Sequence, residues 1–348
     1  KFAKQSHDTI VNQCKKMGSS LDWSREAFTL DEPRNLAVRT AFKRMYDDGL
    51  IYRGARLVNW DPVMQSNVAD DEIEWKEEQA PFYYFQYGPF VIGTSRPETK
   101  FGDKYVVMHP DDERYHKYKH GEKITLEWIN GAITATIIKD TAVDPTFGSG
   151  VMTITPWHDA VDFDMAERHD LDKEQIIDLH GNLLAIAGEF AGLSILEARK
   201  KVVAKLEKKG LVTKVDEKYI HKVATNYRGG GLIEPQIREQ WFIDVNKKFV
   251  LPHSNIPGVK KGQKISLKEL MQGAVRKGAI KIIPERFDKQ YFHWIDNLRD
   301  WCISRQIWYG HRIPVWYRGK EIFCGLEAPE GEGWEQDPDT LDTWFSSG

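Results

Sequence analysis

The sequence lacks several features that mark particular classes of protein. Only three cysteines occur in 348 residues, Cys14, Cys302 and Cys324, too few and too far apart for a disulfide framework or a Cys-x-x-Cys metal site. We expect free thiols. No apolar run approaches the roughly 20 residues that cross a membrane, and the polar stretch 1–19 lacks the apolar core of a secretion signal. We therefore expect a soluble, cytoplasmic protein that does not contact a membrane.

The chain also lacks an excess of charge. Its 49 Lys and Arg side chains nearly balance 52 Asp and Glu, giving a net charge of −3, so the whole chain is no generic polyanion binder. Any RNA contact must use a local patch. One candidate is a predicted helix from Ser194, where Glu197 completes a Ser-x-x-Glu capping box, to Gly210. Its basic face is either solvated or in contact with an RNA backbone, and the sequence leaves both open. That face consists of Arg199, Lys200, Lys201, Lys205, Lys208 and Lys209.

Phosphate-binding, metal-binding and nucleophile motifs are missing as well. The run Gly148-Ser149-Gly150 is too short for a Walker or Gly-x-Gly-x-x-Gly loop, and we assign it no nucleotide role. The histidines lack the spacing of metal ligands, and no Cys or Ser lies in a nucleophile motif. If the protein is a hydrolase, activated water is the expected nucleophile.

The sequence is long enough, and at 41% hydrophobic apolar enough, for two or three domains that each bury a core. A helix is predicted between Asp31 and Gly49, followed by a strand over 51–62. From Pro81 to about 155 the pattern is typical of strands, and an α/β pattern returns over 291–317. Within the strand-rich part, Asn130-Gly131 predicts a tight hairpin with both turn residues at positive φ.

The densest polar cluster follows a predicted strand at 151–154. Thr155, His158, Asp159 and Asp162 lie in a turn that leads into a helix. Two carboxylates three residues apart at a helix start can share one side of it. Alternatively, Asp159 only caps the helix. A second polar run at 93–99 supplies hydroxyls and one guanidinium, which suit either a small polar substrate or a simple hydrogen-bonded turn.

Taken together and in order, these segments resemble the valyl-tRNA synthetases, which are class I aminoacyl-tRNA synthetases. The isoleucine and leucine relatives share some of the segments, but Asp22–Arg25 and Asp342–Ser347 are most similar to the valine type. The matching segments are Leu21–Arg25, Gly49–Arg53, Leu57–Pro62, Thr94–Thr99, Phe147–Phe163, Ile233–Pro235, Glu239–Phe242, Trp301–Gln306 and Leu341–Ser347.

The resemblance implies a mixed α/β and β-rich fold. An inserted editing domain with a β-barrel-like core and helices is expected at 78–224. The segments 1–77 and 225–348 would be parts of the two halves of a class I Rossmann catalytic domain. The His-Ile-Gly-His and Lys-Met-Ser-Lys-Ser signatures that the family uses with ATP are missing. The chain is therefore expected to be an internal fragment that cannot form valyl-adenylate.

The implied activity is post-transfer editing, the hydrolysis of threonyl-tRNA(Val). Threonine is nearly isosteric with valine, and the valine enzymes are the established example of a site that rejects it only about a hundredfold and then edits. Editing would need no cofactor, whereas the full-length synthetase would use ATP and magnesium to attach valine. The expected partners are tRNA(Val), with its 3′-terminal adenosine, and the threonine ester. A monomer is expected.

The resemblance also implies roles for particular residues. Asp162 would hold the α-ammonium of the misattached amino acid, and Asp159 and Thr155 would contact its side chain. His158 lies in the matching motif, where a structural role is equally consistent. Water oriented by these groups and by the ribose hydroxyl would attack the ester carbonyl.

Other residues would bind the nucleotide end of the substrate. Arg96 and Thr99, with Thr94 in the same loop, would line the pocket and contact the terminal ribose. Phe147 would pack against the terminal adenine. Trp308 and Trp344 resemble aromatic residues near the valine pocket of the synthetic site, which would be incomplete here.

The sequence departs from the family at three places. Thr153 stands where a lysine is usual, Trp157 stands where a small residue is usual, and 229–231 is a glycine run where relatives often carry a cysteine. A metal site is therefore not expected there. Two other functions stay open: a tRNA-binding module with an inactive editing pocket, and an editing domain of the isoleucyl type, which would remove valine.

Overall fold

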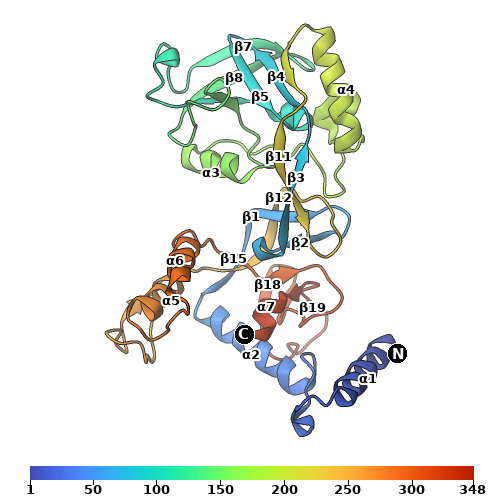
Figure 1. The fold of residues 1–348 in the computed structure, drawn as a ribbon, viewed down its shortest axis with the longest axis vertical. Helices are drawn as coiled ribbons and strands as arrows, with labels where there is room; N and C mark the ends of the chain where they lie inside the picture. Colours follow the sequence, from blue (N-terminus) through green and yellow to red (C-terminus); the bar gives the residue numbers. More distant parts are fainter.

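The computed structural model describes residues 1–348 apart from the side chain of Asp71. The protein is a mixed α/β chain with several separate sheets, and it is elongated, with a narrow waist of paired strands (Figure 1). The insert region, residues 82–216, lies above this waist. The flanking region, residues 31–68 and 234–348, lies below it.

The helices are distributed over both regions, and the N-terminal one projects away from the rest of the molecule (Figure 1). They are α1 (Phe2–Lys16), α2 (Glu32–Asp47), α3 (Ala160–His169), α4 (Ile195–Lys208), α5 (Leu267–Arg276), α6 (Asp288–Asp296) and α7 (Thr343–Ser347). Short 3-10 helices include η3 (Pro97–Gly102) and η5 (Ala185–Phe190).

Two sheets form the insert region. The first has the order β10-β4-β5, and the second has the order β7-β8-β6-β9, in which β6 and β8 are parallel and the other pairs antiparallel. Their bounds are β4 (Phe82–Tyr87), β5 (Phe90–Thr94), β6 (Tyr105–Met108), β7 (Lys123–Trp128), β8 (Gly131–Lys139), β9 (Val151–Thr153) and β10 (Val212–Asp216).

The second sheet is covered on both faces because its side chains alternate. Val106 and Ile137 point into the large core that the two sheets share with α4. Their neighbours Val107 and Ile138 point the other way and pack against Met165 of α3. This period of two is the ordinary alternation of a strand, and it lets α3 pack on the face opposite the large core.

The waist is the antiparallel pair β3 (Ile73–Gln79) and β11 (Ile220–Asn226). The limits 78 and 224 expected from the sequence fall inside this ribbon, and they stay a prediction. Below it, β1 and β12 pair over ten positions in the antiparallel sheet β15-β12-β1-β2. The bounds of that sheet are β1 (Ile51–Asp61), β2 (Ser66–Val68), β12 (Glu234–Ile243) and β15 (Trp301–Cys302).

Short strand pairs complete the flanking region. They are β13 (Phe249–Val250) with β14 (Lys264–Ile265), β16 (Ser304–Arg305) with β20 (Thr340–Leu341), and β17 (Val315–Arg318) between β18 (Glu321–Cys324) and β19 (Glu335–Gln336). A separate core joins Val38 and Phe42 of α2 to Trp241, Ile313 and Leu341. Every strand pair recorded for the flanking region is antiparallel. Its assignment to a Rossmann domain, which is built on parallel strands, therefore stays a prediction from the resemblance.

Local signals in the sequence identify several elements correctly. Asp31 caps α2 by accepting from the amide of Arg34, and Val38 and Phe42 are buried, as the spacing predicts. Ser194 caps α4 by accepting from the amide of Glu197, although the Glu197 carboxylate accepts from the Ser194 hydroxyl and not from its amide. The three cysteines are free, as expected.

The hairpin between β7 and β8 forms, but its turn differs from the expected one. Trp128 pairs with Gly131, so the turn residues are Ile129 and Asn130, and only Gly131 has a positive φ, at 119°. The prediction of positive φ at Asn130 was wrong. Ile129 is 1% exposed in the core, and its burial shifts the turn by one residue.

Candidate functional site

The two polar segments expected from the sequence lie against each other in the insert region. One is 94–103, which follows β5 and contains η3; the other is 153–162, which joins β9 to the first turn of α3. We call them together the η3–α3 site. A Cβ at Gly102 would lie 2.7 Å from Ile176 Cδ1 and 3.3 Å from Thr155 Cγ2, so the lack of a side chain there allows the close approach.

Asp162 is the acidic group most affected by this packing. Its side chain is at the third position of α3, it is 7% exposed, and its Oδ2 accepts from the amide of Thr155 at 2.7 Å. Burial, together with the nearby charge of Asp159, raises the pKa of Asp162 to about 7. A carboxyl group with this pKa changes its charge near neutral pH. A cation that binds beside it favours the ionised form.

Asp159 caps α3. Its Oδ1 accepts from the amides of Val161 at 2.8 Å and Asp162 at 3.1 Å, and the residue is exposed. Asp159 therefore does cap the helix, which was one of the two readings of this residue. Because both bonds use the same oxygen, the cap does not by itself exclude a second role for the carboxylate.

Arg96 is held between two buried carboxylates. Its Nη2 donates to Glu234 Oε2 at 2.5 Å and its Nε to Glu98 Oε1 at 3.2 Å. Arg199 of α4 also donates to Glu98, with both oxygens accepting at 3.0 and 2.9 Å. Although burial opposes the charge, Glu234 and Glu98 raise the pKa of Arg96 above its ordinary value. The guanidinium is thus fixed in place as a permanent cation.

His158 is buried, and both of its ring nitrogens have partners. Nε2 lies 3.0 and 3.1 Å from the amides of Ile176 and Ile177, so it accepts from both. Nδ1 lies 3.1 Å from the carbonyl oxygen of Pro235 and 3.1 Å from Glu234 Oε1. These contacts tie the start of α3 to β12, which favours the structural reading of His158.

The threonine hydroxyls of the first segment form hydrogen bonds with the backbone of the same segment. Thr94 Oγ1 accepts from the amide of Arg96 at 2.9 Å, and Thr99 Oγ1 donates to the Arg96 carbonyl at 3.0 Å. The hydrogen-bonded turn is therefore present. Both residues are buried, as is Thr155, so they can reach only a substrate that enters the site.

Aromatic residues of the predicted site are exposed. Phe147 is 58% exposed and meets Phe82 edge to face at 6.2 Å between ring centroids. Trp308 and Trp344 are exposed in the flanking region, and α7, which carries Trp344, lies far from α3 in Figure 1. These two tryptophans were expected near the valine pocket of the synthetic site, and that assignment stays a prediction.

Four residues of this site have charged or polar contacts that sequence reasoning missed. Lys100, Asp103 and Glu98 are buried in or beside η3, and Glu234 is buried at the start of β12. The charged residues among the apolar ones in 97–103, and the Ile-Glu-Pro match at 233–235, are signals that could have raised them as candidates. Their partners could not have been read from the sequence, because they come from distant segments.

The unusual Trp157 connects the insert region to the flanking region. Its Nε1 donates to Gln236 Oε1 at 2.9 Å, and Gln236 Nε2 donates to the Ile177 carbonyl at 3.1 Å. The large side chain therefore reaches β12, which a small residue could not do.

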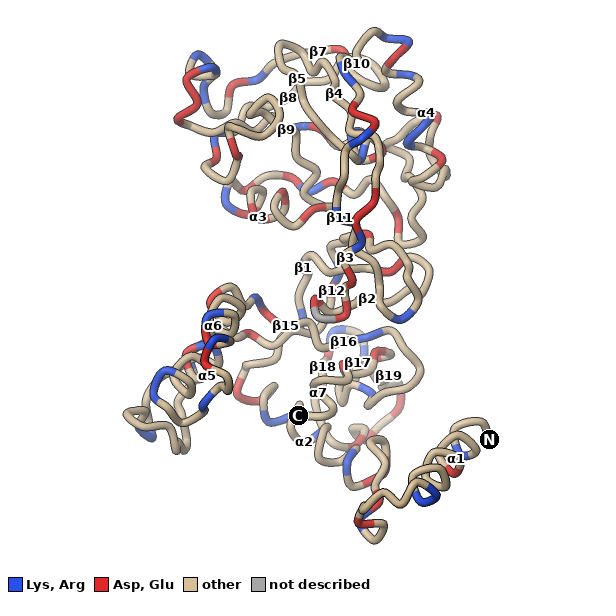
Figure 2. Tube along the Cα trace, in the orientation of Figure 1, with Lys and Arg blue, Asp and Glu red and all other residues tan. Residues whose placement is uncertain are grey.

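The basic face of α4 is partly neutralised by the protein itself. Lys205 pairs with Glu189 at 2.6 Å, and Lys209 pairs with Glu127 at 2.6 Å, in addition to the pair between Arg199 and Glu98. Figure 2 shows acidic and basic segments mixed along the insert region. The reading of this face as an ordinary protein surface is favoured.

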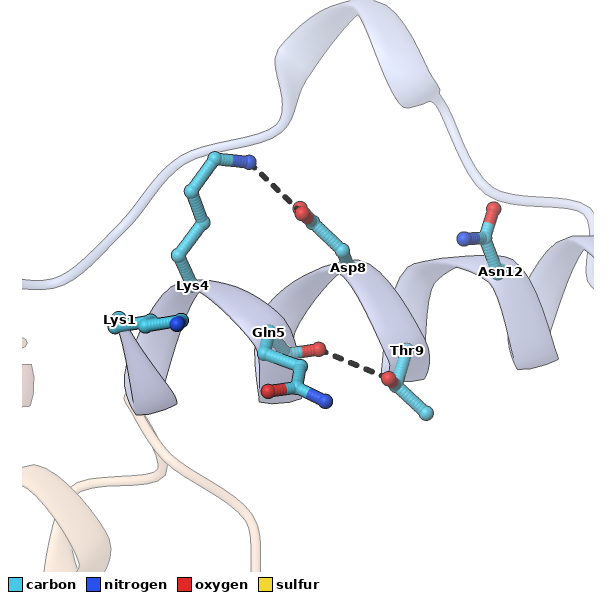
Figure 3. Close-up of a pocket in the computed structure, with 6 residues that line it drawn as sticks. All are labelled: Lys1, Lys4, Gln5, Asp8, Thr9 and Asn12. Atoms are coloured by element: carbon cyan, nitrogen blue, oxygen red, sulfur yellow. Dashed lines mark hydrogen bonds and ion pairs between the residues drawn. The ribbon is translucent and has the colours of Figure 1, made fainter.

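Surface hollows elsewhere do not offer an alternative site. One of about 350 Å³ is lined by Lys1, Lys4, Gln5, Asp8, Thr9 and Asn12. All of these lie along α1, and Lys4 is paired with Asp8 at 2.8 Å (Figure 3), so the hollow is the flank of one helix. Among the described residues, no group of three His, Cys, Asp or Glu side chains is placed to hold a metal ion. In the same part of the chain, no helix is long and apolar enough to cross a membrane.

A second hollow, which borders the flanking region, does not fit ATP. This hollow, beside Asn67, Arg228 and Arg305, has a volume of about 20 Å³, far too small for a nucleotide. Neither ATP signature occurs in the sequence. No chemical step is therefore assigned to ATP or magnesium in these residues.

Comparison with known proteins places the chain in a family. The model of the class I tRNA synthetases for isoleucine, leucine, methionine and valine matches residues 1–331. The chain belongs to this family. It is 43% identical over 362 residues to a valine–tRNA ligase of Protochlamydia amoebophila, which covers 99% of the chain and 36% of that relative. It is 41% identical over 356 residues to a valine–tRNA ligase of Bacillus subtilis, which covers 100% of the chain and 38% of that relative.

The chain thus spans little more than a third of the length of the curated relatives it matches. Among solved structures, the ternary complex of Agrobacterium radiobacter LeuRS with tRNA and LeuAMS aligns over 99% of this chain and 47% of that one. Its TM-score is 0.34 at 16% identity, a superposition too loose to carry an argument.

Proposed function

We propose that this class I synthetase chain carries the editing activity of a valine–tRNA ligase and hydrolyses threonyl-tRNA(Val) at the η3–α3 site. The observation that carries the proposal is Asp162, a buried carboxylate whose hydrogen bond in the site comes from one backbone amide. A buried anion is stabilised by a cation with several donors. The α-ammonium of an aminoacyl ester is such a cation.

Selectivity for threonine would come from the polar groups beside Asp162. The backbone amide of Thr155 donates to the Asp162 carboxylate, and Asp159 lies about one helical turn before Asp162. A site whose buried polar groups pair with a substrate hydroxyl rejects an analogue that lacks it, because those groups are left unpaired. Valine is that analogue, and the correct product would be spared.

The remaining predicted residues would hold the nucleotide end. Arg96, fixed by Glu234 and Glu98, and the neighbouring Thr94 and Thr99 would contact the terminal ribose. Exposed Phe147 would stack on the terminal adenine. Water then attacks the ester carbonyl, the bond from the carbonyl carbon to the ribose oxygen breaks, and a proton passes to that oxygen. The protein supplies positioning and electrostatic stabilisation, without a covalent intermediate or a cofactor.

The longer protein of which this chain would be part is proposed to attach valine to tRNA(Val), using ATP and magnesium outside these residues. The chain itself is proposed to be a cytoplasmic monomer that binds tRNA(Val) and does not form valyl-adenylate.

A deacylation assay with two charged tRNAs tests this function. The chain is expected to release threonine from threonyl-tRNA(Val) and to leave valyl-tRNA(Val) largely intact. Faster release of valine from valyl-tRNA(Ile) would instead identify an isoleucyl-type editing domain. Binding of tRNA without release of either amino acid would identify a binding module.

A further inference from the structure

A buried lysine lies within the η3–α3 site, although the proposed reaction gives it no role. Lys100 projects from η3, and its side chain is 7% exposed. Its Nζ donates to Thr153 Oγ1 at 3.1 Å and lies 3.3 Å from Asp103 Oδ1. A lysine is rarely buried unless its ammonium has polar or charged partners, because removing an ammonium from water is costly.

The contact with Thr153 brings this ammonium to the wall that carries Asp162. Thr153 ends β9 and Thr155 follows two residues later. Both side chains face η3: Thr153 accepts from Lys100, and Thr155 Cγ2 would lie 3.3 Å from a Cβ at Gly102. The amide of Thr155 binds Asp162. The charged groups that act on Asp162 are Asp159 at the start of its own helix and, from the facing segment, Lys100 and Asp103.

We propose that Lys100 is a positioning residue that keeps the buried carboxylate of Asp162 ionised, so that the η3–α3 site presents an anion to the substrate ammonium. The inference rests on the proposed editing function. Without Lys100, Asp103 and Asp162 would be two buried carboxylates without a nearby cation. Such groups take up protons instead of remaining ionised together. The site would then offer an ammonium ion no buried anion at residue 162 and would attract it less.

The state of both carboxyl groups agrees with this account. Burial raises the pKa of Asp103 to about 6, and Lys100 opposes that rise. Burial likewise raises the pKa of Asp162, and Lys100 again opposes it. The buried Asp103 Oδ2 has no hydrogen-bond partner among the described residues, so the ammonium is the main group that keeps Asp103 charged.

Removing the ammonium tests the proposal. Lys100→Met keeps a side chain of similar length. An opposite charge nearby changes a carboxyl pKa by about 1 to 3 units, so deacylation at pH 7 is expected to fall between about fivefold and a few hundredfold. The loss should be largely recovered at higher pH, where Asp162 ionises again.

A charge swap separates this role from simple packing. In the double variant Lys100→Met with Thr153→Lys, the ammonium comes from the facing strand β9. In the parent protein, Thr153 Oγ1 lies 3.1 Å from Lys100 Nζ, so a lysine at 153 can place its ammonium in the same region. We expect activity within about threefold of the parent, since the charge near Asp162 is restored. A loss at Lys100→Met that neither the swap nor higher pH reverses, in a folded protein, would show a purely structural role and overturn the proposal.

An NMR titration of the Asp162 carboxyl carbon, without tRNA, gives a readout that does not need activity. Its pKa should rise in Lys100→Met and return in the swap; an unchanged pKa in Lys100→Met overturns the proposal. If Lys100→Met does not fold, the swap decides: a titration like that of the parent supports the proposal, and one shifted upward contradicts it. If the parent shows no deacylation, the editing function fails while the titration still decides the role of Lys100.

Discussion

The start of α3 and the start of β12 each bury one carboxylate, and the two behave in opposite ways. Burial raises the pKa of Asp162 to about 7. Burial also acts on Glu234, but Arg96 and His158 more than offset it, and the pKa of Glu234 lies below its ordinary value. The difference comes from the partners. Glu234 is in direct contact with a cation of the fold, Arg96, so its role is to hold segments together. Asp162 has no recorded ion pair among the described residues, although Lys100 acts on it, so its carboxylate can receive a cation from outside.

The largest effect is expected where a paired charge is broken. Glu234→Ala would leave Arg96 without a main partner and remove a contact of His158. Breaking a buried pair costs about 3 to 5 kcal/mol, and we expect the lower figure, about 3 kcal/mol, because the Arg96 side chain is 31% exposed. Urea denaturation measures this loss. Glu239→Ala, an exposed carboxylate on the same strand, is the control and should cost less than about 0.5 kcal/mol. Equal effects of the two variants would remove the distinction between paired and exposed groups.

The next effect concerns activity. Asp162→Ala should leave the fold intact and slow the hydrolysis of threonyl-tRNA(Val). A charge-assisted hydrogen bond contributes about 1.5 to 3 kcal/mol, which corresponds to roughly tenfold to more than a hundredfold in rate. Initial deacylation rates measure this. Asp164→Ala, on the same helix but paired with Arg299 on the surface, should keep the parental rate. Full activity of the Asp162 variant would show that this carboxylate does not hold the substrate.

The opposite pKa shifts also predict opposite dependences of stability on pH. Because the pKa of Asp162 is raised from 3.8 to about 7, the folded protein binds the extra proton between these values. This group therefore lowers stability as pH rises through that window, by at most about 1.4 kcal/mol per pH unit. Glu234, with a lowered pKa, adds stability above its unfolded value near 4.5, and that contribution is lost as pH falls through its folded value.

Free energies of unfolding measured from pH 3 to pH 8 would separate these contributions. Asp162→Asn should flatten the decline between about pH 4 and pH 7 and should be more stable than the parent at pH 7. A decline that persists unchanged in Asp162→Asn would place its origin in another buried group, with Asp103 the first to be tested.

The smallest effect is expected at Asp159. Its cap to Val161 and Asp162 is a surface contact, and its loss in Asp159→Ala should cost about 1 kcal/mol of stability. If the carboxylate also contacts the threonine side chain, Asp159→Ala should hydrolyse the threonyl ester with less preference over the valyl ester. Thermal unfolding and the ratio of the two deacylation rates measure the two roles separately. An unchanged ratio would leave Asp159 as a cap alone.

Local patterns were sufficient for much of the fold. Asp31 and Ser194 identify helix starts, and the apolar spacing after them identifies the buried faces of α2 and α4. The alternation around 124–138 identifies a hairpin, but not its turn, because the burial of Ile129 depends on a core assembled from other segments. Helix α1 was not expected at all, since it has no side-chain cap at its start and none of its residues is buried.

What the sequence determined by itself is the family and the position along the chain of the polar segments, because those depend on the order of residue types. Asp159, Asp162 and Arg96 were candidates on that ground. Only the tertiary structure decided which of them are paired. Glu234, which lies 138 residues after Arg96 in the sequence, pairs with the Arg96 guanidinium. Lys100 donates to Thr153, which lies 53 residues after it. Ionisation in a protein interior depends on desolvation and on charges within a few ångströms, and these distances are set by packing.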